Sequence, residues 1–377
     1  DARDSTVDVR GKVVVTPLVA PPAASIRTTT NTWDYNYTRS ALTPTSAGLA
    51  RRGALAVIVV ADSVADRAFD GIGIVQQRGT YDVVGGVPRF SQNAGRGGGR
   101  GGRGGAGAPT QPVPVLLVRS RSRDALHTDG QTVDIKLRSE QFEYPSVNII
   151  GVIRGTDPKL KGEYVVFSSH QDHDGVRYSV DGDSIWNGAD DNASTSVALL
   201  AIARAWKQQP AKRPALFIFH GAEERGLLGS RYHAAHPVVP LDSMVAVLNG
   251  DMIGRNHPDT AALLGSQPPH RNSSALVQMA IDANKATTKF VIDSSWDRPT
   301  HPEGWYFRSD HVPYAERNVP SLFFSTNLHS DYHTPRDEPK NINYPKLTRM
   351  TEWMYMTGWI VANAKTRPAI DPGFVLR

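Results

Sequence analysis

The chain has 377 residues, with 42 Lys and Arg, 37 Asp and Glu, 12 His and no Cys, which gives a formal net charge of +5. The absence of cysteine excludes a disulfide scaffold, a thiolate metal site and a cysteine nucleophile, and so small a charge excess is weak support for a nucleic-acid partner. Hydrophobic residues make up 40% of the chain, enough for a sizeable core, and the length favours two domains or one large domain with an insertion.

Three apolar runs in the N-terminal third predict strands. They cover residues 12–19, 54–61 and 113–118, and are short and rich in β-branched residues. The polar stretch between the first two runs predicts a short helix at residues 46–52. None of the runs approaches the roughly 20 apolar residues that a membrane-spanning helix needs, so we expect no membrane span. The chain begins at Asp1, without an initiator Met or a signal peptide, which predicts a processed or truncated form.

Residues 94–108 form a segment of low complexity. Nine of its fifteen residues are Gly and three are Arg, a composition that cannot bury enough apolar surface to offset the entropy of ordering the chain. The two interpretations are a surface loop and an RGG-type contact with nucleic acid. We favour the loop, because the segment has no aromatic residue on which a base could stack, and we expect no nucleic-acid partner.

From about residue 145 the pattern changes to alternating strands and helices. The predicted strands cover residues 148–153, 164–168, 215–219, 244–248 and 321–324, and the predicted helices cover residues 193–209, 229–236, 274–285 and 344–364. This alternation predicts a mostly parallel, doubly wound sheet. Asp191 and Asn192 precede the first of these helices, and their side chains are expected to cap it.

Potential metal ligands follow the carboxyl ends of several predicted strands, at the edge where an open α/β sheet binds its ligands. They are His170 and Asp172, Glu223 and Glu224, Asp251, and Asp331 with His333, and a further loop with Asp190 and Asp191 leads into a helix. Burying so many carboxylates together without compensation would be prohibitively costly. A divalent metal is the obvious compensation, and a mixed set of imidazole and carboxylate ligands suits zinc.

Six short motifs lie in this part of the chain, and five of them contain the candidate ligands apart from Asp331. They are His170-Gln171-Asp172, Gly188-Ala189-Asp190-Asp191-Asn192-Ala193-Ser194, Glu223-Glu224-Arg225-Gly226-Leu227-Leu228-Gly229-Ser230, Asp251-Met252-Ile253-Gly254, Arg308-Ser309-Asp310-His311 and Tyr332-His333-Thr334-Pro335. In type and order they resemble the motifs of the M28 metallopeptidases, the co-catalytic dizinc aminopeptidases and their relatives. The resemblance covers about residues 140–366. It implies the zinc exopeptidase fold, an α/β/α sandwich around a mostly parallel central sheet.

The region before these motifs resembles, less strongly, the protease-associated domain that is often attached to this family. The similar segments are Arg10–Val14, Gly53–Val60 and Pro112–Val118. We therefore expect a smaller, β-rich protease-associated domain over residues 1–135 and an M28-type catalytic domain over residues 136–377. Many bacterial relatives with this pairing are exported, which implies a secreted or periplasmic location.

The resemblance also implies the ligands of two co-catalytic zinc ions. Asp191 would bridge the two ions. Glu224 and His333 would complete one site, and His170 and Asp251 would complete the other. All five ligand types are present in the chain, so nothing in the sequence indicates a degenerate site.

Further residues would act beside the metals. Glu223 would be the general base that activates a metal-bridging water and passes the proton to the leaving amine. Tyr332 would donate a hydrogen bond to the tetrahedral oxyanion, and the loop around Arg308 would help to hold the substrate α-amine. Asp172 would accept the imidazole N–H of His170 and so fix its tautomer.

Four further histidines and one carboxylate have competing interpretations. Asp190 competes with its neighbour for the bridging position, and the family motif selects the neighbour. His173 and His311 fit family positions near the cleft, where direct contact with substrate is the alternative to a structural role. The i, i+3 spacing of His233 and His236, without a carboxylate partner, predicts surface residues.

These features together predict a zinc-dependent exopeptidase, in the first place an aminopeptidase that removes N-terminal residues from peptides. A carboxypeptidase or dipeptidase of the same family would share every ligand. A relative of glutaminyl cyclase would use one zinc for acyl transfer without water. The non-enzymatic alternatives are an inactive receptor-like protein, which the intact ligand set opposes, and an RNA-binding protein that uses the Gly/Arg segment.

Overall fold

The computed structural model describes residues 6–22, 33–86, 113–126, 130–138 and 140–376. The Gly/Arg segment at residues 94–108 lies outside them. The chain forms two units. Unit 1 comprises Asp1–Gly79, Arg89–Phe142 and Arg177–Ser184, and unit 2 comprises Thr80–Pro88, Glu143–Val176 and Ile185–Arg377. The main division follows Phe142, a little after the predicted boundary between residues 135 and 136.

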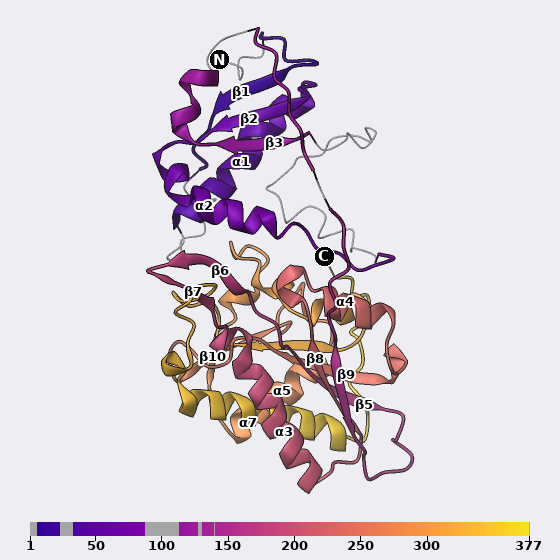
Figure 1. Ribbon diagram of the computed structural model, residues 1–377. Helices are drawn as coiled ribbons and strands as arrows, with labels where there is room; N and C mark the ends of the chain where they lie inside the picture. Colours follow the sequence, from indigo (N-terminus) through magenta and orange to yellow (C-terminus); the bar gives the residue numbers. More distant parts are fainter. Residues whose placement is uncertain (1–5, 23–32, 87–112, 127–129, 139, 377) are drawn as a thin grey trace. The chain divides into compact units, whose positions relative to one another are not determined.

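Unit 1 contains a parallel three-stranded sheet in the order β1-β2-β3. Its elements are β1 (Val13–Pro17), α1 (Trp33–Arg51), β2 (Ala56–Val60), α2 (Ser63–Gln77) and β3 (Val115–Val118). The three predicted strands are confirmed, and alternate strands and helices form two βαβ connections (Figure 1). The helices, with 19 and 15 residues, outweigh the strands, with five, five and four residues. This is more helix than a β-rich domain implies.

The helix predicted at residues 46–52 is present up to Arg51, but its predicted start and short length are wrong, because the segment is the end of the 19-residue helix α1. Two properties of α1 conceal it in the sequence. Pro44 stands inside the helix, and several of the buried positions are polar or aromatic, among them Tyr35, Thr38 and Thr45. The hydroxyls of both threonines donate to the carbonyl four residues earlier, which satisfies them inside the helix.

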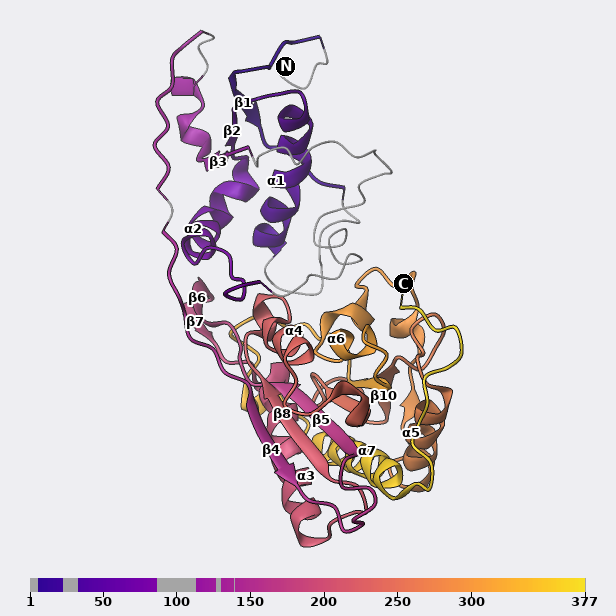
Figure 2. The same cartoon turned by 90° about the vertical axis from the view of Figure 1, so that its right-hand side faces the viewer.

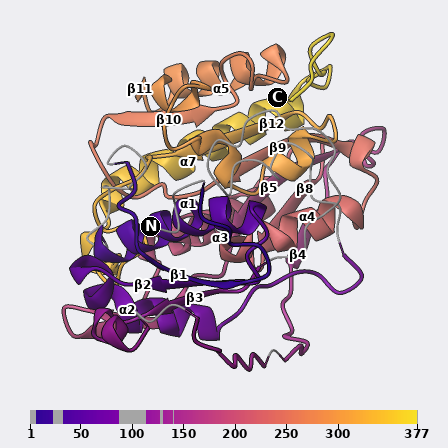
Figure 3. The same ribbon diagram turned by 90° about the horizontal axis from the view of Figure 1, so that it is seen from above.

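Unit 2 is built on a seven-stranded sheet in the order β11-β10-β12-β9-β5-β8-β4 (Figure 3). The strands are β4 (Ile149–Ile153), β5 (Tyr164–His170), β8 (Ala215–His220), β9 (Met244–Gly250), β10 (Thr260–Leu264), β11 (Val291–Ile292) and β12 (Ser321–Ser325). The central strands β12, β9, β5 and β8 are parallel, whereas β4 and β10 join them antiparallel. A separate two-stranded sheet pairs β6 (Gly175–Val180) with β7 (Asp183–Trp186), and Arg177–Ser184 of this hairpin belong to unit 1.

Helices cover both faces of this sheet (Figure 2). On one face, α3 (Thr195–Gln208), α5 (Ser274–Ala286) and α7 (Tyr344–Asn363) share a core with alternate strand residues such as Phe167 and Leu248. On the other face, α4 (Leu228–Ala235) and α6 (Val312–Ala315) pack against residues such as Val166 and Ile218. The sheet and its helices are the predicted α/β/α sandwich. Within the described part of the chain, no helix combines the length and the apolar character needed to cross a membrane.

The segment that leads into α3 differs from the prediction. Asp191 and Asn192 do not cap α3, because the helix begins only at Thr195 and both residues have non-helical backbone angles. The side chain of Asn192 instead donates to the carbonyl of Gly250 at 3.0 Å, which ties the segment to the end of β9. The carboxylate of Asp191 therefore has no capping role and is available to a ligand.

His233 also differs from the prediction. Only His236 of the pair is exposed, whereas His233 is buried where α4 packs against α6. Its Nδ1 atom lies 2.7 Å from the hydroxyl of Tyr314, which in turn lies 3.3 Å from Nε2 of His220. Burial lowers the pKa of His233 to about 4, because the charged imidazolium would lose its hydration.

We expect His233→Gln to weaken the acid sensitivity of folding. Between pH 6.5 and about 4 the unfolded chain binds a proton on His233 that the folded chain excludes, so the free energy of unfolding falls as the pH falls through this window. Thermal unfolding of the metal-free protein at pH 7 and pH 4.5 measures the effect. The difference in Tm between the two pH values should shrink in His233→Gln and stay unchanged in the surface control His236→Gln. An equal difference in Tm in His233→Gln and His236→Gln would contradict the lowered pKa of His233 in the folded protein.

Candidate metal centre

The strand order explains why distant residues meet. β8, β5 and β9 are neighbours and parallel, so their carboxyl ends lie at one edge of the sheet. His170 is the last residue of β5, and Asp251 follows β9 directly. Glu223 and Glu224 form a single turn after β8, and His333 comes from the loop after β12. This edge therefore gathers the predicted ligands into two groups that meet at the Asp191 segment.

His170 lies at the centre of the first group, with Glu223 and Asp251. Its Nε2 atom is 3.5 Å from Oδ2 of Asp251 and 3.9 Å from Oε2 of Glu223. It is also 3.2 Å from Oδ1 of Asp191. One oxygen each of Asp191 and Asp251, the two other predicted ligands of this zinc site, thus lies within 3.5 Å of the same imidazole nitrogen, and Glu223 lies 3.9 Å from it.

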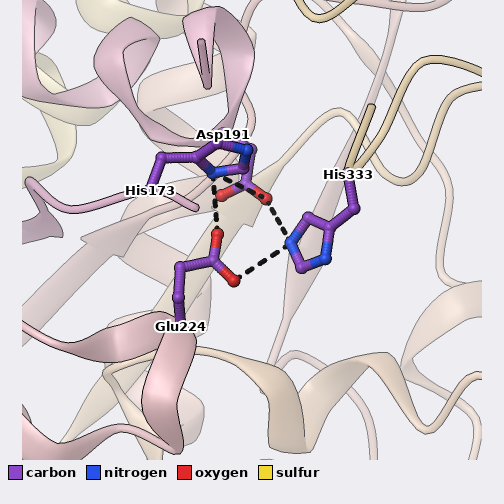
Figure 4. Close-up of side chains that lie close together, drawn as sticks. All are labelled: His173, Asp191, Glu224 and His333. Carbon is purple, nitrogen blue, oxygen red and sulfur yellow. Dashed lines mark ion pairs between the residues drawn. The ribbon is translucent and has the colours of Figure 1, made fainter. Parts of the chain in front are cut away.

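The second group contains His173, Asp191, Glu224 and His333 (Figure 4). The Nε2 atom of His333 is 3.0 Å from Oδ2 of Asp191 and 3.1 Å from Oε2 of Glu224. Asp191 therefore presents one oxygen to each group, Oδ1 towards His170 and Oδ2 towards His333. This division of its two oxygens is the geometry that a bridging carboxylate requires.

The donor atoms fit a divalent metal. In the described part of the chain, the Nε2 atoms of His170 and His333 are buried and have no aligned hydrogen-bond partner. Buried polar atoms are normally hydrogen-bonded, so unpartnered nitrogens beside carboxylates have the property expected of metal-ligand atoms. For bonds of 2.0–2.1 Å, a tetrahedral zinc site separates its ligand atoms by about 3.3 Å. The separations within the two groups lie close to this value.

The two adjacent glutamates have opposite electrostatic environments. Burial raises the pKa of Glu223 well above its ordinary value, and the nearby Glu224 and Asp310 add to the effect against the attraction of His170. Burial also opposes ionisation of Glu224, but His333 and the other histidine of its group hold its pKa well below the ordinary value. The raised pKa suits Glu223 to accept a proton, and the lowered pKa suits Glu224 to bind a metal ion as a carboxylate. Neighbouring groups with opposite pKa shifts are typical of acid–base sites.

Asp190 joins neither ligand group in the described part of the chain. Its Oδ1 atom accepts the backbone N–H of Gly254 at 2.6 Å, and Oδ2 lies 3.4 Å from Nε2 of His329. The carboxylate is fully buried in this interaction. Of the two neighbouring aspartates, only Asp191 faces the predicted ligands.

Asp172 accepts a hydrogen bond from the imidazole of His170, as predicted, but it does so through its backbone carbonyl, which lies 2.9 Å from Nδ1 of His170. Its carboxylate is 3.9 Å from that nitrogen and instead accepts the backbone N–H groups of Glu223 at 3.0 Å and Glu224 at 3.2 Å. The carboxylate turns away because these two amides, at the start of a short helical turn, attract negative charge. Asp172 thus positions both glutamates.

We expect Asp172→Ala to lower zinc affinity and kcat/KM by about 10–100-fold, the usual cost of removing a residue that orients metal ligands. The reason is that two backbone amides lose their acceptor and the Glu223–Glu224 turn loses its anchor. Asp172→Asn keeps one acceptor oxygen, so its zinc affinity and kcat/KM should lie between those of Asp172→Ala and those of the wild type. Zinc competition titrations and initial rates measure both effects. Wild-type values for Asp172→Ala would refute this role.

Tyr332 and Arg308 form one unit beside the ligands. Arg308 donates through Nη2 to the Tyr332 hydroxyl at 2.8 Å and through Nη1 to Glu303 at 2.8 Å. The ring of Tyr332 stacks on His333 with centroids 3.8 Å apart. Since the hydroxyl accepts from Arg308, its own O–H proton is left for another acceptor. Arg308 itself is a cation and cannot hold a substrate ammonium, so the prediction for its loop does not extend to this side chain.

Three residues near the ligands were given no role from the sequence. Ser309 donates to Oδ2 of Asp251 at 2.8 Å, and Asn249 donates to the Ser309 hydroxyl at 2.8 Å. Asp337 accepts the backbone N–H groups of Asp190 and Asp191 at 3.0–3.1 Å. Ser309 lies within one of the six motifs and Asp337 lies two residues after another. This position in the sequence was the only indication that they belong to the site.

A family model and several curated proteins match part of this chain. A model described as "Peptidase family M28" matches residues 148–357. Aminopeptidase YwaD of Bacillus subtilis is 27% identical over 242 residues, which cover 62% of this chain and 48% of that protein. The probable leucine aminopeptidase 2 of Aspergillus oryzae is 29% identical over 193 residues, which cover 50% of this chain and 35% of that protein. The chain thus spans half or less of the length of these two curated relatives.

Solved structures resemble the fold of the whole chain. A zinc aminopeptidase from Bacillus subtilis has a TM-score of 0.54 with 20% identity, over 99% of this chain and 76% of that one. An aminopeptidase from Aneurinibacillus has a TM-score of 0.52 with 18% identity, over 99% of this chain and 74% of that one. At these identities the likeness establishes the fold, and the coverage extends it to both units.

Proposed function

Because the chain belongs to peptidase family M28, we propose that it is a zinc-dependent aminopeptidase that hydrolyses the N-terminal residues of peptides. The observation that carries the proposal is the carboxylate of Asp191, which presents one oxygen to each of two ligand groups, with Glu223 beside them as a carboxylate outside the five expected ligands. The names of the relatives, aminopeptidases in bacteria and fungi, support the direction of the cleavage.

Two zinc ions would be held by His170, Asp251 and Asp191 on one side and by Asp191, Glu224 and His333 on the other. When bound, such a pair acidifies a water molecule and polarises the scissile carbonyl. Glu223, with its raised pKa, takes the proton from the attacking water and gives it to the leaving amine. Tyr332 donates its O–H to the developing oxyanion while Arg308 keeps the phenol oriented.

Unit 1 would be the protease-associated domain of this enzyme, and the protein would act outside the cytoplasm, in a secreted or periplasmic form. The coverage of 99% of this chain by the zinc aminopeptidase fold supports a two-domain peptidase. Peptides would be the partners, without a nucleic acid. Fractionation of the producing cells tests the location.

Elemental analysis and a peptide assay test the function together. We expect about two zinc ions per dialysed chain and release of p-nitroaniline from leucyl-p-nitroanilide. A chelator should abolish release, and added zinc should restore it. About one zinc and cyclisation of an N-terminal glutaminyl peptide would contradict the proposal in favour of a cyclase. Cleavage only of peptides with a free carboxyl terminus would contradict it in favour of a carboxypeptidase.

A further inference from the structure

His173 lies inside the second ligand group, although it is not one of the five ligands that the family motifs imply. It follows His170 by three residues in the loop after β5, and its side chain is only 7% exposed. The Nδ1 atom is 2.8 Å from Oε1 of Glu224 and 3.9 Å from Oδ2 of Asp191. Figure 4 shows the ring turned towards the same carboxylates that His333 faces.

The short distance between His173 and Glu224 is not an aligned hydrogen bond. Within the described residues, Nδ1 of His173 and Oε1 of Glu224 are both buried atoms without a hydrogen-bond partner. The Nε2 atoms of His170 and His333 have the same property, close to carboxylate oxygens and unpaired with them. In both groups, imidazole nitrogens thus lie close to carboxylate oxygens without hydrogen bonds between them, as is expected of atoms that bind the same metal ion.

The geometry of the whole group supports a fourth ligand. One donor atom from each of His173, Asp191, Glu224 and His333 lies within 4.8 Å of the others. Two imidazoles and two carboxylates form a donor set that zinc accepts in tetrahedral sites. The backbone leaves room for the ring of His173 at Gly188, where φ is +68° and any Cβ would collide with that ring.

We propose that His173 binds, through Nδ1, the metal ion held by Asp191, Glu224 and His333. This inference rests on the proposed zinc site. It replaces both interpretations of His173 given from the sequence, a structural role and direct contact with substrate; for the second, a ring that is only 7% exposed offers little surface. A cavity of about 240 Å³ is lined in part by His173, and water there would be an acceptor for the remaining ring N–H.

The consequence is that the two metal sites are unequal. The site with His173 has four protein ligands, which is typical of a closed site. The other site has the three ligands His170, Asp191 and Asp251 and an open position, because Glu223, which lies in the same group at 3.9 Å from Nε2 of His170, acts as the base and not as a ligand. The four-ligand site would hold its ion more tightly. Reaction would take place at the open position.

Zinc binding to the full-length protein tests the proposal. In a competition titration, wild type should bind two zinc ions, and His173→Gln should bind one of them about 100-fold or more weakly, beyond what loss of an orienting residue costs. The matched control His236→Gln, an exposed histidine, should bind both ions as wild type does. His173→Asp supplies a ligand oxygen and should recover part of the affinity.

X-ray absorption of the zinc-loaded wild type gives a readout that requires no variant. It should count about 1.5 imidazoles per zinc, since three histidines would serve two ions. A count of about 1.0 would overturn the proposal, as would two zinc ions bound by His173→Gln with wild-type affinity. A wild-type chain that binds no zinc would instead refute the dizinc function on which the proposal rests.

Discussion

Glu223→Gln should keep both zinc ions and lose about 10²–10⁴-fold in kcat, the usual contribution of a general acid–base group. The substitution preserves the shape of the side chain and the backbone N–H that donates to Asp172 at 3.0 Å. It removes only the ability to accept and return a proton. Glu223 is suited to that role because burial raises its pKa well above the ordinary value, so it binds a proton more readily than an exposed glutamate.

The neighbouring Glu224→Gln is the matched control for this experiment. Glu224 faces His333 at 3.1 Å through Oε2, and its pKa is held low by the two histidines of its group, as expected of a ligand. Its substitution should therefore lower zinc content along with kcat. Elemental analysis and steady-state rates separate the two cases. Near-normal turnover of zinc-loaded Glu223→Gln would refute the role of Glu223 as base.

The sheet of unit 2 could be predicted because its strands are unambiguous in the sequence. The strand at residues 164–170 and the strand at residues 244–250 are almost wholly buried, and their continuous apolar runs end in polar groups. By contrast, β10 (Thr260–Leu264) was missed because its Ala and Leu residues favour no particular element. Its strand character comes from its antiparallel pairing with β12, which is a tertiary contact.

The ligand residues could be predicted because their chemical types and order match a known motif set. The contacts that orient these ligand residues could not be predicted. Ser309 reaches Asp251 across 58 positions in sequence, and Asp337 reaches Asp191 across 146. Hydrogen bonds to backbone amides, such as those of Asp172, leave no residue-type signature in the partner. His233 shows the converse, since its spacing suggests a surface but the packing of α6 against α4 buries it.

Asp191→Asn should cost the protein both zinc ions and all measurable peptidase activity. Its two oxygens are divided between His170 at 3.2 Å and His333 at 3.0 Å, so it is the one ligand that both sites share. Asparagine offers a single neutral oxygen and an NH₂ group, which repels a cation. The electrostatic setting agrees, since despite burial the flanking histidines keep the pKa of Asp191 below its ordinary value.

Asp190→Asn provides a matched control at the adjacent position. The Asp190 carboxylate accepts from the backbone N–H of Gly254 at 2.6 Å, and an asparagine oxygen can accept the same hydrogen bond. This variant should keep about two zinc ions, whereas Asp191→Asn should keep fewer than one after dialysis. If zinc content falls equally in both variants, the loss reflects damage to the loop, and the bridging role of Asp191 is refuted. Because the two substitutions are chemically identical and one residue apart, a larger zinc loss in Asp191→Asn than in Asp190→Asn reflects the contacts of Asp191 with both ligand groups and not the general cost of replacing an acid by an amide in this loop.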